Sequence, residues 1–166
     1  MSLFSLEGKV VLVTGASRGI GKAVAEKLVL QGAKVAGTAT SESGAAKISE
    51  YLGENGKGYA LNVTDADSVA DVLAAIKQDL GDIDVLVNNA GITRDNLMMR
   101  MKDEEWSDII DTNLTSIFRL SKAVMRPMMK KRFGRIINIG SVVGTMGNAG
   151  QANYCLLYTS PSPRDS

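Results

Sequence analysis

Five short apolar runs, separated by longer segments with helical periodicity, limit the possible folds of this chain more than any other feature. The runs are rich in β-branched residues at consecutive positions, which is typical of strands buried on both faces of a sheet. We predict strands at 9–14, 34–38, 58–61, 85–87 and 136–139. We predict helices at 19–30, 41–52, 65–80 and 103–132, the last broken near Asn113 and strained at Pro127. Strands that alternate with helices form a parallel sheet, so the predicted class is a doubly wound α/β fold that stops after the fifth strand.

The composition is that of one ordinary folded domain. The chain has 166 residues, of which 45% are hydrophobic and 22% charged, and its net charge of +1 favours neither nucleic acid nor a membrane, so we expect neither as a partner. It contains no apolar signal core and no apolar run of membrane-spanning length. The single cysteine, Cys155, excludes an intramolecular disulfide and fits a reducing compartment, so we expect a cytoplasmic protein. With no histidine, Ser-His-Asp and Cys-His systems are excluded, and we predict no metal site.

A glycine-rich turn lies between the first predicted strand and the first predicted helix. Its residues are Gly15, Ala16, Ser17, Arg18, Gly19, Ile20 and Gly21. Such a turn brings backbone N–H groups to a helix N-terminus, where a pyrophosphate is stabilised by the helix dipole. Three glycines could simply shape a tight turn, but the strand before and the helix after favour a dinucleotide site on a Rossmann-like sheet.

The charges near this turn favour NADP over NAD. NAD-selective sites usually place a carboxylate near the end of the second strand, to bind the ribose 2′-hydroxyl. Here the first acidic residue after that strand is Glu42, while Arg18 supplies a cation. A 2′-phosphate would be attracted by Arg18 and hydrogen-bonded by Thr40 or Ser41. The alternative is that Arg18 is only a solvated loop residue.

Taken in order, the motifs of this chain resemble those of the short-chain dehydrogenase/reductases. They are the glycine-rich turn, the sequence Asn88-Asn89-Ala90-Gly91, Ser141, and Tyr154 thirteen positions after Ser141. The segments 91–101 and 140–148 are particularly similar to those of the bacterial reductases that act on 3-oxoacyl groups bound to acyl carrier protein. The resemblance covers 4–154 and implies NADPH-dependent reduction of a 3-oxoacyl thioester in fatty acid biosynthesis, a substrate carried by acyl carrier protein, and a homotetramer.

The resemblance also implies a role for each motif residue. The turn and Thr40 would bind the cofactor phosphates, Asn62 and Val63 would flank the adenine, and the ribose and nicotinamide would lie against Asn89, Ala90 and Gly91. Asn113 would hold an ordered water in the proton relay, Ser141 would bind the substrate carbonyl oxygen, and Tyr154 would donate a proton to it. These roles suit the reaction, because reduction of a ketone develops negative charge on its oxygen.

The position four residues after Tyr154 departs from the family pattern. The family has a lysine there, whose charge lowers the pKa of the tyrosine and which anchors the nicotinamide ribose; this chain has Tyr158. From residue 156 onward the sequence is small, polar and Pro-rich. We therefore expect an incomplete NADP-binding reductase domain at 1–155 and an unrelated, disordered tail at 156–166, as a frame change, a chimeric join, non-coding sequence or a short isoform would give.

Other functions stay open at this stage. The chain could be a non-catalytic NADP-binding fragment, a gene-model artefact, or another short-chain alcohol dehydrogenase. Because the family continues with a further helix and strands, we expect a marginally folded chain whose fifth strand is an open edge. The methionines Met98, Met99 and Met101 could pack in the core or a lid, or shape an acyl groove. A basic cluster could complement a helix dipole or bind an acidic carrier protein; it comprises Arg119, Lys122, Arg126, Lys130, Lys131, Arg132 and Arg135.

Overall fold

The structure is a computed structural model that describes residues 5–92, 95–141 and 143–154. The strands are β1 (Val10–Val13), β2 (Lys34–Ala39), β3 (Gly56–Ala60), β4 (Val85–Asn88) and β5 (Arg135–Asn138). The α-helices are α1 (Gly19–Leu30), α2 (Glu42–Leu52), α3 (Ala66–Asp79), α4 (Asp103–Ile109), α5 (Ser116–Lys131) and α6 (Val143–Met146). Short 3₁₀ turns are η1 (Gly53–Asn55) and η2 (Met98–Arg100), and η3 (Ile110–Thr115) is π-helical. No helix in these ranges is both long and apolar enough to span a bilayer.

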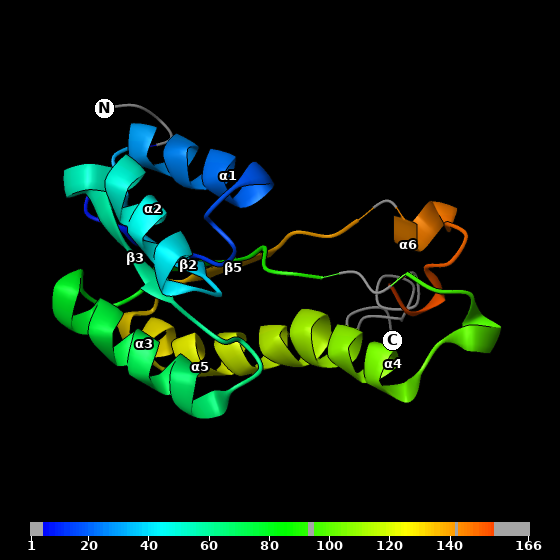
Figure 1. Ribbon diagram of the computed structural model, residues 1–166. Coiled ribbons are helices and arrows are strands. Elements are labelled where there is room, and N and C mark those ends of the chain that lie inside the picture. The colour runs from blue at the N-terminus through cyan, green and yellow to red at the C-terminus, as the bar shows by residue number, and fades with distance from the viewer. Residues whose placement is uncertain (1–4, 93–94, 142, 155–166) are drawn as a thin grey trace.

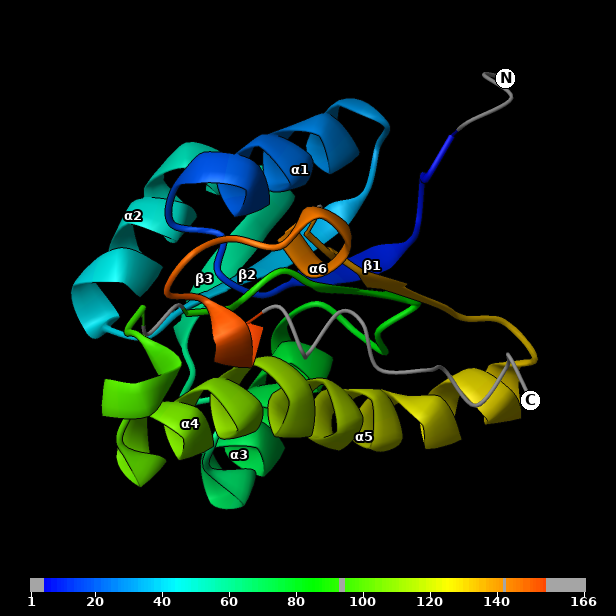
Figure 2. The same ribbon diagram turned by 90° about the vertical axis from the view of Figure 1, so that its right-hand side faces the viewer.

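The strands form one parallel sheet in the order β3-β2-β1-β4-β5. The strand order reverses at β1, and the connections from β1 and β4 lead to opposite sides of the sheet. Helices α1 and α2 cover one face, and α3 and α5 cover the other, while α4 and α6 project beyond one end of the sheet (Figures 1 and 2). The doubly wound α/β fold predicted from the sequence is therefore confirmed. In such sheets ligands bind at the carboxyl ends of the strands, where the order reverses.

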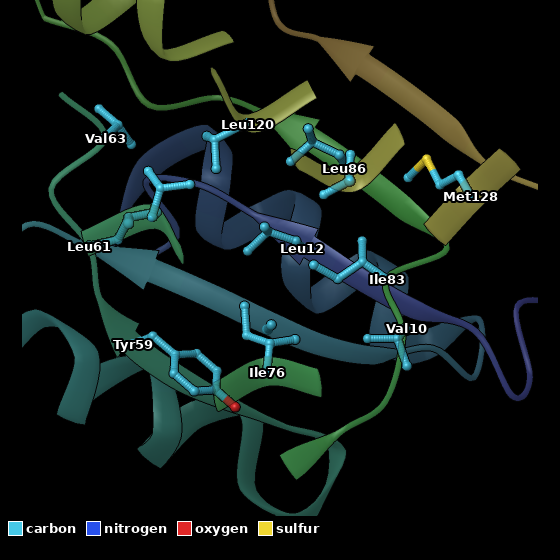
Figure 3. Packing of buried hydrophobic residues seen from close by; sticks show 13 residues of the cluster. Val10, Leu12, Tyr59, Leu61, Val63, Ile76, Ile83, Leu86, Leu120 and Met128 are labelled. Carbon is cyan, nitrogen blue, oxygen red and sulfur yellow. The ribbon is translucent and has the colours of Figure 1, made fainter. Parts of the chain in front are cut away.

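Two apolar clusters fix the helices to the sheet. Between the sheet and α3 and α5, Leu12 and Leu86 pack with Ile76, Leu120 and Met128 (Figure 3). On the other face, residues of β1 and β4 pack against Ala25 of α1 and against Ile48 and Leu52 of α2. Because successive strand residues point to opposite faces, these strands must be apolar at every position. The consecutive Val and Leu residues of β1 and β4 meet that requirement.

The predicted elements are close to those observed, with differences that have physical causes. Strand β3 begins two residues earlier than predicted, at Gly56, since pairing with β2 extends over a glycine-rich segment of low strand propensity. Helix α1 buries small residues, Gly21 and Ala25, whereas Ile20 is 63% exposed at the end of the sheet. In β5, Ile136 and Ile137 are half-exposed, because β5 pairs only with β4 among the described residues. Helix α5 continues through Pro127.

The predicted break near Asn113 is a π-helical turn, η3, between α4 and α5. The side chain of Asn113 is buried, and it forms two hydrogen bonds with the backbone of Ile92. Its Oδ1 accepts from the Ile92 N–H at 2.8 Å, and its Nδ2 donates to the Ile92 carbonyl oxygen at 2.7 Å. The wider turn therefore places a polar side chain where it fixes the segment after β4, and π-turns of this kind are frequent at functional sites.

Asp84 joins three elements at the opposite end of the sheet. Its carboxylate accepts a hydrogen bond from the Val10 N–H at 2.9 Å and one from Lys131 Nζ at 2.8 Å. Burial alone would raise the pKa of Asp84, but the bonds from Lys131 and Val10 outweigh it and hold that pKa below its ordinary value. Asp84 consequently stabilises the fold at pH values above the unfolded pKa of about 3.9, and this stabilisation is lost as the pH falls through the lower folded pKa.

We expect Asp84→Asn to lower the free energy of unfolding by about 2 kcal/mol at pH 7, since two bonds to a buried carboxylate are weakened. Urea denaturation measured at several pH values should show this difference shrinking as the pH falls below about 4, where the unfolded carboxyl takes up a proton, and disappearing below the lowered pKa of the folded carboxyl. Asp82→Asn is the matched control, because Asp82 contacts Lys77 at 3.7 Å with side chains 36% and 72% exposed, and we expect less than about 0.5 kcal/mol. Equal losses of unfolding free energy in Asp84→Asn and Asp82→Asn at pH 7 would contradict this stabilising role of the Asp84 carboxylate.

Candidate active site

The glycine-rich turn between β1 and α1 has a backbone that side chains would obstruct. Gly15 and Gly19 have positive φ angles of 65° and 57°, which favour glycine. A Cβ on Gly21 would overlap the carbonyl oxygen of Gly15 and come within 2.5 Å of Asn89 Nδ2. The first turn of α1 carries no acidic side chain, so the helix dipole there favours a bound anion. These features suit a phosphate group close to the backbone.

The turn is fixed to the end of β4 by Thr14 and Asn89. The Thr14 hydroxyl accepts hydrogen bonds from the N–H groups of Asn89 and Ala90, each at 2.9 Å. Asn89 Nδ2 donates to the carbonyl oxygens of Thr14 and Gly15, each at 3.2 Å. The Asn89 side chain therefore builds the turn, in addition to lining the cavity beside it. Thr14 was not predicted as a site residue, because a threonine at a strand end carries no specific signal.

Tyr51 of α2 supports the turn from the other side. Its hydroxyl donates to the carbonyl oxygen of Ala16 at 2.7 Å. Burial, with a smaller contribution from the charge of Glu26, raises the pKa of Tyr51 to about 12, so the hydroxyl stays protonated and remains a donor. Ala16 is itself fully buried, and its N–H donates to the carbonyl oxygen of Thr38 at 2.8 Å. Sequence analysis did not predict this role of Tyr51, because the contact joins residues 35 positions apart.

A first cavity of about 470 Å³ opens along the turn toward β2 and β3. Its lining includes Gly15, Ser17, Arg18, Gly19, Ile20, Thr38, Ala39, Thr40, Leu61, Val63, Asn89, Ala90, Gly91 and Ile92. Of the two predicted phosphate partners, Thr40 lines this cavity, whereas the Ser41 hydroxyl caps α2 by accepting from the Gly44 N–H at 3.1 Å. Asn62 does not line it; the Asn62 side chain accepts two hydrogen bonds from Thr64.

A second cavity of about 580 Å³ lies beside the first, and the two share Arg18, Ile20 and the residues from Asn89 to Ile92. Its lining also includes Asn88, Asn113, Ile117, Ile139, Gly140, Ser141 and Tyr154. The predicted residues Asn113, Ser141 and Tyr154 are thus brought to one cavity from η3, the end of β5 and the last described segment. The Ser141 hydroxyl accepts a hydrogen bond from the Val143 N–H at 3.2 Å. A hydroxyl can donate one bond while it accepts another, so Ser141 can still donate to a ligand.

Asn88 adds a buried polar group to the wall of the second cavity. Its Nδ2 donates to Asn138 Oδ1 at 2.9 Å, across the paired strands β4 and β5. Its Oδ1 is buried and has no hydrogen-bond partner among the described residues. Buried acceptors are almost always satisfied in native proteins, so this oxygen is an exception beside the second cavity.

The two cavities together fit a dinucleotide. The glycine turn offers backbone to a pyrophosphate, the first cavity has apolar residues at Leu61 and Val63 for a base, and the second has polar groups for a ribose and a substrate. The sequence model of the short chain dehydrogenase family matches residues 9–156. The chain belongs to the short-chain dehydrogenases. Tyr158, which stands at the family's lysine position, lies outside the described residues, as does the 156–166 tail.

Curated short-chain dehydrogenases of bacteria are very similar to this chain. The 3-oxoacyl-[acyl-carrier-protein] reductases FabG of Vibrio cholerae, Escherichia coli K12 and Pseudomonas aeruginosa are 77%, 73% and 63% identical to it. The matches extend over 150 to 153 residues and cover 90% of this chain. The chain spans 62% of the length of these relatives.

The methionines and the basic cluster of this short-chain dehydrogenase can also be placed. Met98 and Met99 are 71% and 95% exposed in η2, so the core-packing interpretation is wrong for both. Within the basic cluster, Lys131 pairs with Asp84, and Arg119 donates to backbone carbonyls. The other five cations of the cluster are exposed, namely Lys122, Arg126, Lys130, Arg132 and Arg135.

Proposed function

We propose that this chain forms the cofactor site and the carbonyl-binding pair of an NADPH-dependent reductase of 3-oxoacyl thioesters. The observation that carries the proposal is that Ser141 and Tyr154 line the same cavity as Asn89, Ala90 and Gly91, beside the glycine turn. A hydroxyl pair next to a dinucleotide site suits reduction of a carbonyl group. The names of the bacterial relatives supply the substrate class, a 3-oxoacyl group on acyl carrier protein. The domain for this activity is 1–155.

The cofactor in this proposal is NADP(H). Arg18 is exposed at the rim of the first cavity, and Thr40 lines the same cavity. A 2′-phosphate would pair with the Arg18 guanidinium and accept a hydrogen bond from Thr40. Glu42 is the first residue of α2 and is not among the lining residues, so the carboxylate that NAD-selective sites use is missing from the cavity wall.

The residues of the second cavity divide the chemistry between them. Bound NADPH supplies a hydride to the substrate carbonyl carbon. Ser141 donates a hydrogen bond to the carbonyl oxygen, and Tyr154 delivers the proton to it as negative charge develops. Both the oxygen and the nitrogen of the Asn113 side-chain amide are hydrogen-bonded to the backbone of Ile92. An ordered water in the proton relay would therefore be held by the Asn113 backbone carbonyl, in the π-helical turn.

A second candidate, NADP(H) binding without turnover, is favoured by one observation, the tyrosine at position 158. A lysine there would place a cation near Tyr154 and would hold the nicotinamide ribose. The described residues Arg18, Thr40 and Val63 of the first cavity would still hold the phosphates and the adenine. Under this candidate, we expect the chain to bind NADPH and to oxidise it with an acetoacetyl thioester no faster than the background rate.

The exposed cations on and after α5 support acyl carrier protein as the partner in this proposal. Lys122, Arg126 and Lys130 follow one another at intervals of four residues, so they lie along one face of the helix. An acidic carrier protein would be attracted to such a row of charges. The helix dipole explains cations in the last turn of α5, but Lys122 lies near its middle.

Cofactor titration tests the proposal first. We expect the chain to bind NADPH about tenfold or more tightly than NADH, because a charge-assisted bond to the 2′-phosphate is made only with NADPH. Arg18→Ala should remove most of this preference, while Lys27→Ala, which removes an exposed cation in the last turn of α1, should leave it unchanged. The measurement is fluorescence titration with each cofactor, followed by NADPH oxidation in the presence of an acetoacetyl thioester. Equal affinities for the two cofactors would contradict the NADP assignment, and absence of binding to both would reject the proposal.

A further inference from the structure

Arg119 on α5 forms a bridge to the loop after β3. Its Nη1 donates to the carbonyl oxygen of Val63 at 3.1 Å and to that of Thr64 at 2.8 Å. The contact joins residues 55 and 56 positions apart, and the guanidinium, which is always charged, supplies both bonds. Backbone carbonyls of a surface loop are usually hydrogen-bonded to water. Here Arg119 binds two of them instead, and so fixes the position of the loop relative to α5.

The loop that Arg119 contacts is tied down from within as well. Asn62 Oδ1 accepts from the N–H of Thr64 at 3.1 Å and from its hydroxyl at 2.7 Å, and the N–H of Asn62 donates to Ser68 Oγ at 3.1 Å. These bonds shape the loop and connect it to α3, and the Leu61 N–H, which donates to the carbonyl oxygen of Ala39 at 2.8 Å, connects its start to β2. Arg119 is a connection from this loop to the helix on the far side of Val63.

The loop contributes the apolar end of the first cavity. Leu61 and Val63 are buried to 3% and 7% exposure, and both line this cavity together with Thr38 and Ala39 of β2 and with Thr40, which follows β2. Neither residue lines the second cavity, which contains Ser141 and Tyr154. An apolar recess at the end remote from the reacting residues suits the flat ring of the adenine, which is the apolar part of a dinucleotide.

We propose that Arg119 is a positioning residue for cofactor binding, which holds Val63 where the first cavity accommodates the adenine ring. This inference rests on the proposed NADP(H) function and deepens it. The Arg119 guanidinium donates its hydrogen bonds to backbone carbonyls of the loop. It therefore affects cofactor binding through the position of the loop and not by direct contact with the cofactor. Removal of the guanidinium leaves the Val63 carbonyl without its donor and allows the loop to shift.

Loss of the Arg119 guanidinium is expected to weaken binding of the adenine half of the cofactor and not of the nicotinamide half. In Arg119→Ala, we expect the dissociation constants of NADPH and of the adenine-half fragment 2′,5′-ADP to rise about tenfold, as loss of a charged hydrogen bond implies. The dissociation constant of the other half, reduced nicotinamide mononucleotide, should stay within about twofold of wild type. All three are measured by calorimetric titration of the full chain. Arg100→Ala is the matched control, because Arg100 is an exposed arginine in η2 that does not line either cavity.

The fragments separate positioning from general destabilisation and from long-range charge. A structural role alone would weaken both fragments or neither, and loss of a distant charge would affect both, because each fragment carries a phosphate. Arg119→Lys keeps a charged donor with a shorter reach, and it should weaken 2′,5′-ADP by about threefold while preserving the melting temperature, so it tests the inference even where Arg119→Ala folds poorly. Unchanged 2′,5′-ADP affinity in both variants, with NADPH still bound by wild type, overturns the inference and leaves the proposed function standing. Failure of wild type to bind NADPH overturns both.

Discussion

Replacement of Gly21 by alanine is expected to abolish NADPH binding at concentrations that saturate wild type. Gly21 is in the first turn of α1 and is buried, and the added methyl group would overlap the carbonyl oxygen of Gly15. Neither that backbone atom nor Asn89 Nδ2, at 2.5 Å, can move without breaking the bonds that fix the turn. We expect a loss of about 3 kcal/mol in the free energy of unfolding. The dissociation constant of NADPH should rise about 100-fold or more.

Helix propensity alone would predict the opposite effect of Gly21→Ala, a gain in the free energy of unfolding. In an exposed helix, a change from glycine to alanine stabilises by about 1 kcal/mol. Gly19→Ala is the control within the same turn, because a Cβ there meets no atom within 4 Å, and only its φ of 57° opposes the change, at a cost of about 1–2 kcal/mol. Thermal denaturation and NADPH titration of the two variants decide the matter. A Gly21→Ala variant that melts above wild type and binds NADPH normally would refute the geometry of the turn.

The sheet of this protein could be predicted from its sequence because its strands obey one simple rule. A strand buried on both faces must be apolar at each position, and 10–13 and 85–88 are nearly so. Boundaries were less accurate at β3, where Gly56 and Gly58 carry no strand propensity and pairing with β2 decides the structure. The exposure of Ile136 and Ile137 in β5 depends on what lies next to the strand, which an apolar pattern does not encode.

The candidate site could be predicted where it rests on local chemistry and not where it rests on long-range contacts. The glycine turn has a spacing that follows from its backbone, and Ser141 and Tyr154 have the order and spacing of a family. In contrast, Thr14, Tyr51 and Arg119 act through bonds to backbone atoms 35 to 76 positions away, and nothing in their neighbouring sequence marks them. For Asn62 the resemblance implied a contact with the adenine; its Oδ1 accepts two hydrogen bonds from Thr64, and the contact with the adenine stays a prediction.

Replacement of Tyr158 by lysine is expected to raise the rate of NADPH oxidation with an acetoacetyl thioester by about 100-fold or more. Reduction of the ketone requires a proton at the carbonyl oxygen, and the proposed donor of that proton is Tyr154. A lysine one helical turn after Tyr154 lies on the same face in the family pattern, where its charge makes the tyrosine a better acid. The matched control is Tyr158→Phe, which removes the same hydroxyl without adding a cation, and its rate should equal that of wild type.

Tyr154→Phe in the Tyr158→Lys background separates proton donation from cofactor binding. Tyr154 and Ser141 line the second cavity but not the first, so this change should return the rate to the level without lysine while the dissociation constant of NADPH stays within about twofold. Ser141→Ala should also lower the rate, since it removes a donor to the carbonyl oxygen. Stopped-flow measurement of NADPH oxidation under single-turnover conditions gives the rate of the chemical step directly. If Tyr154→Phe leaves the lysine-dependent increase intact, Tyr154 is not the proton donor and the charge at position 158 acts on another group.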